Sequence, residues 1–453
     1  MEDTIAAIST SLGAGGIAIV RVSGPNALNV ADAAFCSCHG KPSQFPTHSI
    51  RYGRIAQNGE ILDQVMLAVF RAPHSYTTED TVEINCHGGA LTAQRILSCC
   101  LQYGARLAEP GEFTKRAFLN GRIDLTQAEA VMDLISARTQ RAQVFAAHAL
   151  EGHLFRRVEA LREKVANILA HIEAYIDFPE EDIQPATRQK LGTDLGESVS
   201  LLRELLSTAR EGRILRDGIP VAIVGRPNVG KSSLMNALLG RDRSIVTPVP
   251  GTTRDSVEDT VTINGFPIRL TDTAGYRKAR GAVESEGIKR MFNVLAQADV
   301  VLHVLDTSRL LSPLDLELTR LCGSKEIIHV YNKTDLPGKL KPQTALNDIH
   351  RVYVSALSGI GLESLRTLIR KIISSGAVGF TDLDVAINER HAYELSQALV
   401  LLINAEEGQS IGKDLALVSQ HLRLGLDAIA RVTGKTVDED ILDRIFNTFC
   451  IGK

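Results

Sequence analysis

The stretch Val221-Ala222-Ile223-Val224 runs directly into Gly225-Arg226-Pro227-Asn228-Val229-Gly230-Lys231-Ser232. The first four residues are typical of a buried strand, and the spaced glycines followed by lysine and serine predict a phosphate-binding loop that opens the next helix. Main-chain N–H groups of such a loop turn toward phosphates, and the helix N-terminus adds positive potential. We therefore expect Lys231 to reach the outer phosphates and Ser232 to bind Mg²⁺.

Two further motifs indicate which nucleotide binds. Asp272-Thr273-Ala274-Gly275 follows the apolar run Ile268 to Leu270, where an acid can reach the metal through water and a glycine amide can sense the γ-phosphate. Asn332-Lys333-Thr334-Asp335 ends the apolar run Ile327 to Tyr331, and Asp335 can accept hydrogen bonds from the ring N–H and the amine of guanine. Adenine lacks that amine, and a polar group left unpaired can cost a discrimination of about 10⁴. The motifs predict GTP rather than ATP.

Two loops complete the predicted nucleotide site. Gly251 to Asp255 offers Thr253 as a second hydroxyl ligand for Mg²⁺, and Ser355-Ala356-Leu357 looks like a base-contacting loop with Leu357 where lysine is commoner. Tyr276 stands where Ras-like proteins carry a water-orienting glutamine, so another group must organise hydrolysis. The predicted GTP-binding residues are Asn228, Val229, Gly230, Lys231, Ser232, Ser233, Thr247, Pro248, Val249, Pro250, Gly251, Thr252, Thr253, Asp272, Thr273, Ala274, Gly275, Asn332, Lys333, Asp335, Ser355 and Ala356.

Around these motifs the sequence predicts an α+β multidomain fold. Residues 1–118 alternate short strand-like runs with helical segments, which is typical of an α+β domain. Residues 119–215 and 378–453 carry apolar residues every three or four positions, the period of amphipathic helices. Residues 216–377 alternate strand, loop and helix, which predicts an α/β P-loop G domain. We interpret this domain as an insertion into an α-helical bundle.

One helical segment is expected to be long and apolar on one side. Its apolar positions are Leu154, Val158, Leu161, Val165, Ile168 and Ile172. Proline and acidic residues between Asp177 and Asp182 are poor helix interior, so the helix should end there.

Composition limits the classes of partner. The 453 residues carry a net charge of −3, so no global field attracts nucleic acid or anionic lipid. We expect no membrane attachment, because no apolar run is long enough to cross a bilayer. The acidic start Met1-Glu2-Asp3 lacks the features of a signal peptide, which favours the cytoplasm, where cysteines stay reduced.

Two charged residues interrupt apolar strands in the first domain. Arg21 ends the face Ile17, Ile19, Arg21, and Glu83 lies on the polar face of Val82 to Cys86. An internal ion pair and a ligand site explain these charges equally well.

Four features together resemble the MnmE (TrmE) family of tRNA uridine-34 modification GTPases. They are Asn228 in the phosphate loop, the run Gly251 to Asp255, the missing glutamine, and Phe449-Cys450-Ile451-Gly452-Lys453. The resemblance covers the whole chain, including Arg116 to Gly121 and Asp124 to Ala130. It implies a homodimer that hydrolyses GTP to GDP and phosphate. It also implies a heterotetramer-type complex with MnmG (GidA), a flavin- and NADH-using partner, which places a carboxymethylaminomethyl or aminomethyl group on the wobble uridine of tRNA.

The resemblance also implies that hydrolysis requires K⁺ beside Mg²⁺ and the pairing of two G domains. At matching positions the K⁺ ligands would be Asn228, Thr247, Val249 and Thr252. Such a cation supplies charge where Ras uses an arginine finger. The catalytic residue would be Glu284, which orients the attacking water, with Glu286 as its local competitor.

For the first domain the resemblance implies a tetrahydrofolate site that takes a 5,10-methylene or 5-formyl derivative. Arg21, Glu83, Arg122 and Lys453 occupy its binding positions, although the family often carries lysine at the third. Glu83 suits a pterin because that ring offers adjacent N–H and amine donors. Cys450 could be a nucleophile or a small apolar side chain against the helices.

A different class is also consistent with the nucleotide motifs. A ribosome-assembly GTPase of the Era or Der type is an RNA-binding switch without modification chemistry. Such proteins carry a dedicated RNA-binding module or a second G domain, whereas this sequence has one phosphate loop.

Overall fold

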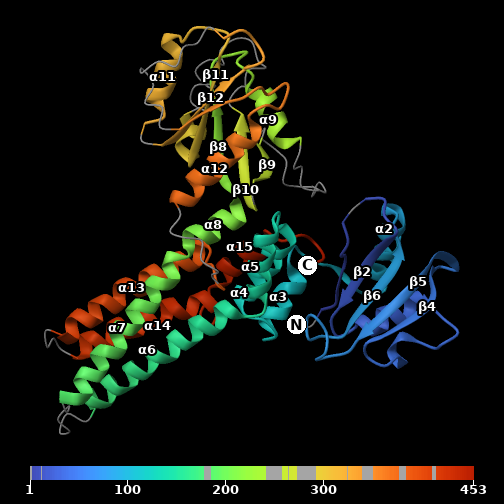
Figure 1. The fold of residues 1–453 in the computed structure, drawn as a ribbon. Coiled ribbons are helices and arrows are strands. Elements are labelled where there is room, and N and C mark those ends of the chain that lie inside the picture. The colour runs from blue at the N-terminus through green and yellow to red at the C-terminus, as the bar shows by residue number, and fades with distance from the viewer. Residues whose placement is uncertain are drawn as a thin grey trace, which may run out of the picture. The chain divides into compact units, whose positions relative to one another are not determined.

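The computed structural model describes residues 3–11, 13–177, 185–240, 258–263, 265–272, 292–323, 325–338, 350–376, 384–410 and 415–453. The chain forms two compact units (Figure 1). Unit 1 comprises Met1–Met132, Ala149–Val199 and Glu394–Lys453, and unit 2 comprises Asp133–His148 and Ser200–Tyr393. The combination of long helices and two sheets confirms the predicted α+β multidomain fold. The predicted boundaries at residues 118, 215 and 377 stay predictions.

Unit 1 contains a seven-stranded sheet with the order β3-β4-β5-β6-β2-β1-β7. Neighbouring strands are antiparallel except β1 and β7, which are parallel. Its strands are β1 (Ile5–Ile8), β2 (Ile17–Ser23), β3 (Phe35–Cys36), β4 (Ser49–Gln57), β5 (Glu60–Phe70), β6 (Thr81–His87) and β7 (Arg106–Leu107). In β2, Ala18, Val20 and Val22 belong to the buried core. Because successive side chains of a strand point to opposite faces, Arg21 lies on the other face.

Two helices cover one face of this sheet. The first face packs on α1 (Ala27–Ala34) and α2 (Ala90–Gln102), and a 3-10 turn (Pro42–Gln44) lies beside α1. The second face, which we call the open face, keeps large apolar side chains exposed. They include Ile17, Ile50, Tyr52 and Met66.

Helices make up most of the chain outside the two sheets (Figure 1). They are α3 (Glu112–Leu119), α4 (Leu125–Ser136), α5 (Gln140–Leu150), α6 (His153–Asp177), α7 (Pro185–Ser207), α13 (Glu389–Ser410), α14 (Leu415–Thr433) and α15 (Glu439–Phe446). The six apolar residues predicted for one face of α6 are all buried, and α6 packs on α14. The described helix runs to Asp177, and because residues 178–184 lie outside the described part of the chain, the predicted helix end stays a prediction. No helix in the described part of the chain is both long enough and apolar enough to cross a membrane.

Unit 2 contains a six-stranded sheet with the order β13-β12-β11-β8-β10-β9. Neighbouring strands are parallel except β9 and β10. The strands are β8 (Ile219–Val224), β9 (Glu258–Ile263), β10 (Phe266–Asp272), β11 (Val300–Asp306), β12 (Glu326–Asn332) and β13 (Arg351–Tyr353), and the helices are α8 (Ala209–Asp217), α9 (Lys231–Leu239), α11 (Pro313–Leu321) and α12 (Leu362–Gly376). Open parallel sheets of this kind bind ligands beyond the carboxyl ends of their strands.

Candidate nucleotide site and first-domain site

The phosphate loop joins the carboxyl end of β8 to α9 in unit 2, and two of its glycines leave no room for a side chain. A Cβ on Gly225 would lie 2.5 Å from the carbonyl oxygen of Val304, and a Cβ on Gly230 would overlap the amide of Asn332. The φ angles of the two glycines are +150° and +98°, a region that favours glycine. The loop is therefore held closely against β11 and the end of β12.

Lys231 and Ser232 stand at the start of α9. The Lys231 ammonium donates hydrogen bonds of 2.8 Å to the main-chain oxygens of Gly225 and Arg226, so it lies inside the phosphate loop. The Ser232 hydroxyl donates to Oδ2 of Asp272 at 2.7 Å. Hydroxyl and carboxylate oxygens are ligands that Mg²⁺ prefers. This pair therefore fits the metal that the sequence predicts.

Asn332 and Lys333 brace the phosphate loop from the end of β12. The Asn332 side chain donates from Nδ2 to the main-chain oxygen of Val229 at 2.9 Å and accepts at Oδ1 from the N–H of Ala356 at 3.0 Å. The Lys333 ammonium donates to the main-chain oxygen of Asn228 at 2.8 Å. Hydrogen bonds from Asn332 and Lys333 thus join the base-binding motif to the phosphate loop.

Asp306 holds Lys333 in place, a role that the sequence analysis missed. Its Oδ2 accepts from the Lys333 ammonium at 2.7 Å, and its Oδ1 accepts from the Ser308 hydroxyl at 2.6 Å. Burial would raise the pKa of Asp306, but the hydrogen bonds from Lys333 and Ser308 hold it below its usual value. The available signal was an acid directly after Val300 to Leu305, a run that is apolar except for His303.

Asp335 and Ser355 form the predicted base end of the site. The Ser355 hydroxyl donates to Oδ1 of Asp335 at 2.6 Å. A carboxylate has two acceptor oxygens, so Oδ2 can still serve a guanine ring. Leu357 is 89% exposed in the loop that follows, where it offers an apolar surface.

Arg226 anchors the phosphate loop to α11, which the sequence analysis also missed. Its Nε lies 2.9 Å from Oδ1 of Asp315, which is fully buried. Oδ2 of Asp315 accepts from the N–H of Ser312 at 2.9 Å. A buried carboxylate without such partners is costly, so this link fixes one side of the loop.

Part of the predicted nucleotide site lies outside the described residues. These positions are Thr247, Pro248, Val249, Pro250, Gly251, Thr252, Thr253, Thr273, Ala274, Gly275 and Glu284. Of the predicted K⁺ ligands, the structure describes Asn228, whose φ is +63°. Ser233 is described and lies exposed in the first turn of α9.

In unit 1, Arg21 and Glu83 face each other on the open face of the sheet. They are register partners on β2 and β6. Nε and one terminal nitrogen of Arg21 each lie 2.8 Å from Oε1 of Glu83. The side chains are 16% and 21% exposed. The internal ion pair considered from the sequence is therefore present, and both partners remain accessible to a ligand.

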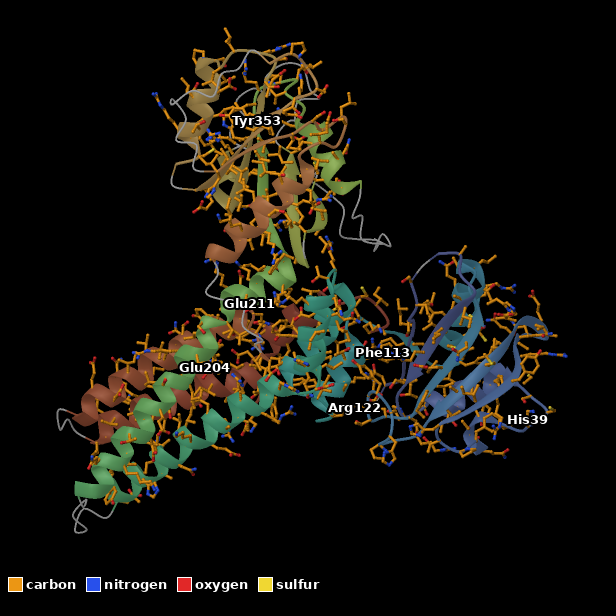
Figure 2. All side chains as sticks on the ribbon, viewed as in Figure 1. His39, Phe113, Arg122, Glu204, Glu211 and Tyr353 are labelled. Atoms are coloured by element: carbon orange, nitrogen blue, oxygen red, sulfur yellow. The ribbon has the colours of Figure 1, made fainter. Side chains whose placement is uncertain are left out.

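Aromatic rings surround the two predicted arginines. The Arg21 guanidinium carbon lies 5.8 Å from the ring centre of Tyr76 and 5.5 Å from that of Phe113. The Arg122 guanidinium carbon lies 5.9 Å from the same Tyr76 ring, and Arg122 donates to the main-chain oxygen of Ser75. Figure 2 labels Phe113 and Arg122. Cation–π contact to Tyr76 is thus shared by Arg21 and Arg122.

The segment 450–453 docks against this region. Its main-chain oxygens accept from the N–H groups of Gly111 and Phe113 at 3.4 and 3.2 Å, and from the Arg21 guanidinium at 3.4 Å. Burial and the nearby charge of Arg21 hold the pKa of Lys453 below its usual value. Residues from opposite ends of the sequence therefore meet here.

Contacts thus link the predicted residues Arg21, Glu83 and Arg122, directly or through Tyr76. Lys453 belongs to the docked segment, whose Gly452 accepts from Arg21. Cys450 lies in the docked segment and is exposed. Both roles considered for Cys450, a nucleophile and a small apolar side chain, stay open.

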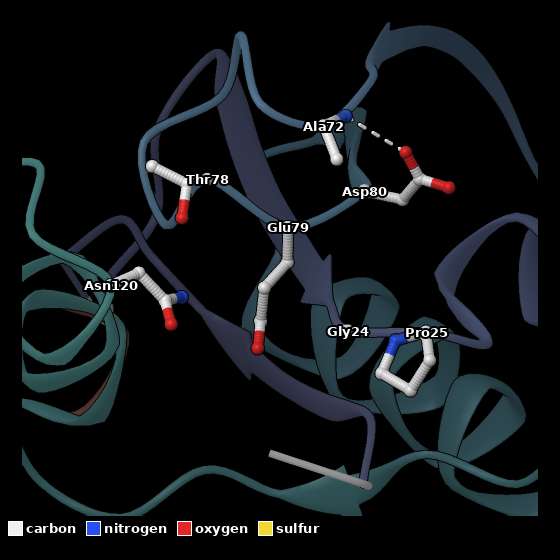
Figure 3. A pocket seen from close by; sticks show the side chains of 7 residues that line it. All are labelled: Gly24, Pro25, Ala72, Thr78, Glu79, Asp80 and Asn120. Carbon is white, nitrogen blue, oxygen red and sulfur yellow. Dashed lines mark hydrogen bonds between the residues drawn. The ribbon is translucent and has the colours of Figure 1, made fainter.

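Arg116 anchors the loop between β5 and β6, which carries Tyr76. It is fully buried and donates to Asp3 and Glu112 at 2.9 Å and to both carboxylate oxygens of Glu79 at 3.2 Å. Glu79 also lines a pocket of about 450 Å³, and Figure 3 shows this side chain among the other lining residues. The other lining residues are Gly24, Pro25, Ala72, Thr78, Asp80 and Asn120.

Comparisons with known proteins give full-length similarity. The family model of the MnmE helical domain matches residues 125–450, and that of the GTP-binding protein TrmE N-terminus matches residues 4–122. The tRNA modification GTPase MnmE of Geobacter sulfurreducens is 45% identical over an alignment of 456 positions that covers 100% of both chains. The protein of the same name from Thermoanaerobacter pseudethanolicus is 43% identical and covers 100% of this chain and 99% of its own length. Among solved structures, the G domain of the T. maritima FeoB iron transporter is 26% identical and covers 34% of this chain and 98% of its own, with a TM-score of 0.25.

Proposed function

This chain belongs to the MnmE family and is a GTP hydrolase of tRNA modification, and we propose that its hydrolysis depends on K⁺ and serves wobble-uridine chemistry. Together with MnmG it forms 5-carboxymethylaminomethyl- or 5-aminomethyluridine at position 34 of tRNA in the cytoplasm. The observation that carries this proposal is the full-length similarity to tRNA modification GTPases. It covers both units, so the chemistry of unit 1 is proposed together with that of unit 2.

For GTP hydrolysis, residues of the phosphate loop, α9 and the base end, together with Thr253, which lies outside the described residues, would supply binding and charge. Lys231 and the N–H groups of the phosphate loop would neutralise the outer phosphates. Ser232, near Asp272, would hold Mg²⁺, with Thr253 as the second hydroxyl. The metal when bound offsets charge that develops on the phosphoryl oxygens. Asp335 would select guanine by accepting from its ring N–H and amine.

A monovalent cation would take the place of an arginine finger. Asn228 would offer its side-chain oxygen, joined by oxygens of Thr247, Val249 and Thr252. Support comes from the Asn228 backbone, which has a φ of +63° and is held by Lys333 at 2.8 Å. A main chain fixed in this way restricts the directions open to the side chain.

The attacking water would be oriented by a carboxylate of the second switch. We assign this role to Glu284, with Glu286 as the alternative. A carboxylate is too negative to contact the phosphate directly, so it would act through water.

The first-domain site would take a one-carbon tetrahydrofolate, as the 5,10-methylene or 5-formyl derivative. Glu83 fits the pterin because a carboxylate accepts from adjacent N–H and amine groups. Arg21, Arg122 and Lys453 add positive charge for the carboxylates of the same molecule. Cys450 lies in the segment docked beside Arg21 and is exposed, which supports a chemical role for its thiol.

A second copy of the chain would cover the open face of the unit 1 sheet. Ile50 and Tyr52 are each 59% exposed there, and Met66 is 48% exposed. Contiguous apolar surface of this kind marks interaction sites. Register pairing places Ala68 of β5 between Ile50 of β4 and Glu83 of β6. The homodimer interface would therefore border the Arg21–Glu83 pair.

Nucleoside analysis of tRNA tests the proposed function. A strain that lacks this protein should lose 5-carboxymethylaminomethyl- and 5-aminomethyluridine from the wobble position, and the parent gene should restore them. Unchanged nucleosides together with a defect in ribosome assembly would instead favour an RNA-binding GTPase of the Era or Der type.

A further inference from the structure

The start of α5 carries two arginines that do not stabilise the helix itself. Thr139 precedes the helix, and its hydroxyl accepts from the N–H of Ala142 at 3.1 Å. Arg138 stands just before this cap, and Arg141 lies in the first turn. The positive potential at a helix N-terminus disfavours cations there. The contacts that the two arginines make elsewhere in unit 2 therefore explain them better than helix stability does.

Both arginines contact the hairpin formed by β9 and β10. Arg138 donates to the Thr260 hydroxyl on β9. The Arg141 guanidinium carbon lies 5.6 Å from the ring centre of Phe266, the first residue of β10. Phe266 pairs with Ile263 at the turn end of the hairpin, and β9 is an edge strand of the six-stranded sheet. The start of α5 thus holds the hairpin at its turn end and at its outer strand.

Arg141 also contacts α8. A terminal nitrogen of Arg141 lies 3.7 Å from Oε1 of Glu211, in the first turn of α8 (Figure 2). At that distance the ion pair has no hydrogen bond, and the Arg141 side chain is 34% exposed, so the contact is a weak one. The helix itself is closely held, because a Cβ on Gly212 would overlap the main-chain oxygen of Ile387. Arg141 therefore joins the hairpin to a fixed helix through contacts that can break and form again.

The other end of the hairpin lies in the nucleotide site. Asp272, the last residue of β10, accepts from the Ser232 hydroxyl at 2.7 Å, so Mg²⁺ bound there acts directly on this strand. Glu258, the first residue of β9, follows the predicted loop Gly251 to Asp255. The seven residues of β10 extend over about 20 Å. A shift of the hairpin at the nucleotide would therefore also move its contacts with α5.

We propose that Arg138 and Arg141 couple the nucleotide site to the helical part of the chain, by transmitting nucleotide-dependent changes of the β9–β10 hairpin to α5. We call the residues of this contact the hairpin clamp: Arg138, Arg141, Glu211, Thr260 and Phe266. The last two residues of α5 belong to unit 1, so a change in α5 affects a helix that both units share. The coupling is reciprocal, because whatever alters α5 alters nucleotide affinity by the same factor.

Hydrogen exchange of the full chain with and without nucleotide tests the proposal. The probes are GDP and the non-hydrolysable GTP analogue GMPPNP, each with Mg²⁺, and peptides from residues 138–150 and 225–240 report on α5 and on the phosphate loop. In the parent we expect nucleotide to protect the phosphate loop and to change the protection of α5 amides about fivefold or more, the range of allosteric coupling. In Arg138→Ala/Arg141→Ala the change in α5 should fall below about twofold, while phosphate-loop protection and GTP turnover stay near the parent.

Thr260→Val tests the same contact from the hairpin, and this conservative change serves if the double variant does not fold. It removes the hydroxyl that accepts from Arg138 but keeps a β-branched side chain that suits a strand. It should reduce the change in α5, and Arg138→Ala added to it should cause no further reduction, because both changes remove one contact. Arg203→Ala is the matched control, because this exposed arginine of α7 also belongs to unit 2 but lies outside the clamp.

Each contrary result has its own meaning. A parent in which nucleotide protects the phosphate loop but leaves α5 unchanged would overturn the coupling. A phosphate loop that is not protected either would overturn the nucleotide site and the coupling together. A full response of α5 in Arg138→Ala/Arg141→Ala, or an equal loss in Arg203→Ala, would remove the assignment to the clamp. Further loss when Arg138→Ala is added to Thr260→Val would contradict the contact between these two residues as the route.

Discussion

Charged side chains near both candidate sites form short ion pairs with side chains of opposite charge. Lys333 is paired with Asp306, Arg226 with Asp315 and Arg21 with Glu83, at 2.7 to 2.9 Å. Removing one partner of a buried pair typically costs about 3 to 5 kcal/mol, because the other charge is left uncompensated. Asp315 is fully buried, whereas Glu83 is partly exposed. A ligand can therefore replace one partner in the Arg21–Glu83 pair more easily than in the Arg226–Asp315 pair.

At the base end of the nucleotide site, Asp335→Asn should shift nucleotide preference from guanosine to xanthosine triphosphate. The amide can donate where the carboxylate accepted, which suits the oxygen that xanthine carries in place of the guanine amine. Competition binding with labelled GTP and XTP measures the shift. Unchanged GTP preference would show that the base binds elsewhere.

A second residue-scale prediction concerns the pH dependence of stability. His303 is fully buried on β11, its ring centre is 5.3 Å from that of His329, and its Nδ1 lies 3.2 Å from the Thr319 hydroxyl. Burial, and then the charges of His329 and Arg226, lower the pKa of His303 to about 3. The folded state thus keeps His303 neutral while the unfolded chain protonates it near its usual value of about 6.5.

It follows that the contribution of His303 is complete above about pH 6.5 and is lost as the pH falls toward 3, at up to about 1.4 kcal/mol per pH unit. Urea unfolding at pH 7, 6 and 5, followed by circular dichroism, should show a shallower loss of stability for His303→Leu than for the parent. Equal pH slopes for the two proteins would contradict a neutral buried imidazole.

At the scale of elements, the docked segment 450–453 depends on one glycine. Gly452 has a φ of +95°, and a Cβ there would overlap the main-chain oxygen of Ile8 on β1. Gly452→Ala should displace the segment and weaken tetrahydrofolate binding at least tenfold, while GTP turnover stays near the parent. Gly104→Ala is the matched control, because its φ of +104° carries the same strain but its Cβ would meet nothing within 4 Å. Equal folate affinity in both variants would mean that the segment does not contribute to the site.

Patterns within single elements were predictable from the sequence. The buried face of α6 and the strand, loop and helix around Lys231 follow from periodicity and motif spacing, which are local properties. The position of Asp306 at the end of a strand was visible in the sequence, but its partner Lys333 was not, and nothing in the sequence pointed to Tyr76, because both contacts depend on tertiary packing. Tyr76, for example, meets Thr114 across 38 positions of the chain, and no pattern near residue 76 indicates that contact.

At the scale of the whole molecule, comparing GTP turnover in K⁺ with turnover in Na⁺ tests the proposed mechanism most directly. If K⁺ offsets charge on the phosphates, GTP turnover should be high in KCl and low in NaCl at equal ionic strength, since sodium is smaller than the site requires. Pairing of G domains with a transition-state mimic should show the same cation dependence. Equal turnover in the two salts would rule out the cation mechanism.

Two variants separate cation binding from chemistry. Asn228→Ala should erase the difference between KCl and NaCl. Glu284→Ala should keep K⁺-dependent pairing but slow hydrolysis by roughly 10² to 10⁴, the range for losing a proton-handling or water-positioning group. Full activity in Glu284→Ala would move the assignment to Glu286 or to another residue.

The contact between Arg21 and the docked segment also has a consequence for protein synthesis. The two partners lie 431 positions apart in the chain. A ribosome that adds about 5 to 20 residues per second needs roughly 20 to 90 seconds to make that stretch. The sheet that carries Arg21 and Glu83 can thus form while most of the chain is still untranslated, yet the site stays incomplete until residues 450–453 emerge. If the site binds folate as proposed, a nascent or prematurely terminated chain should consequently be unable to sequester it, so that only finished molecules would take up this ligand.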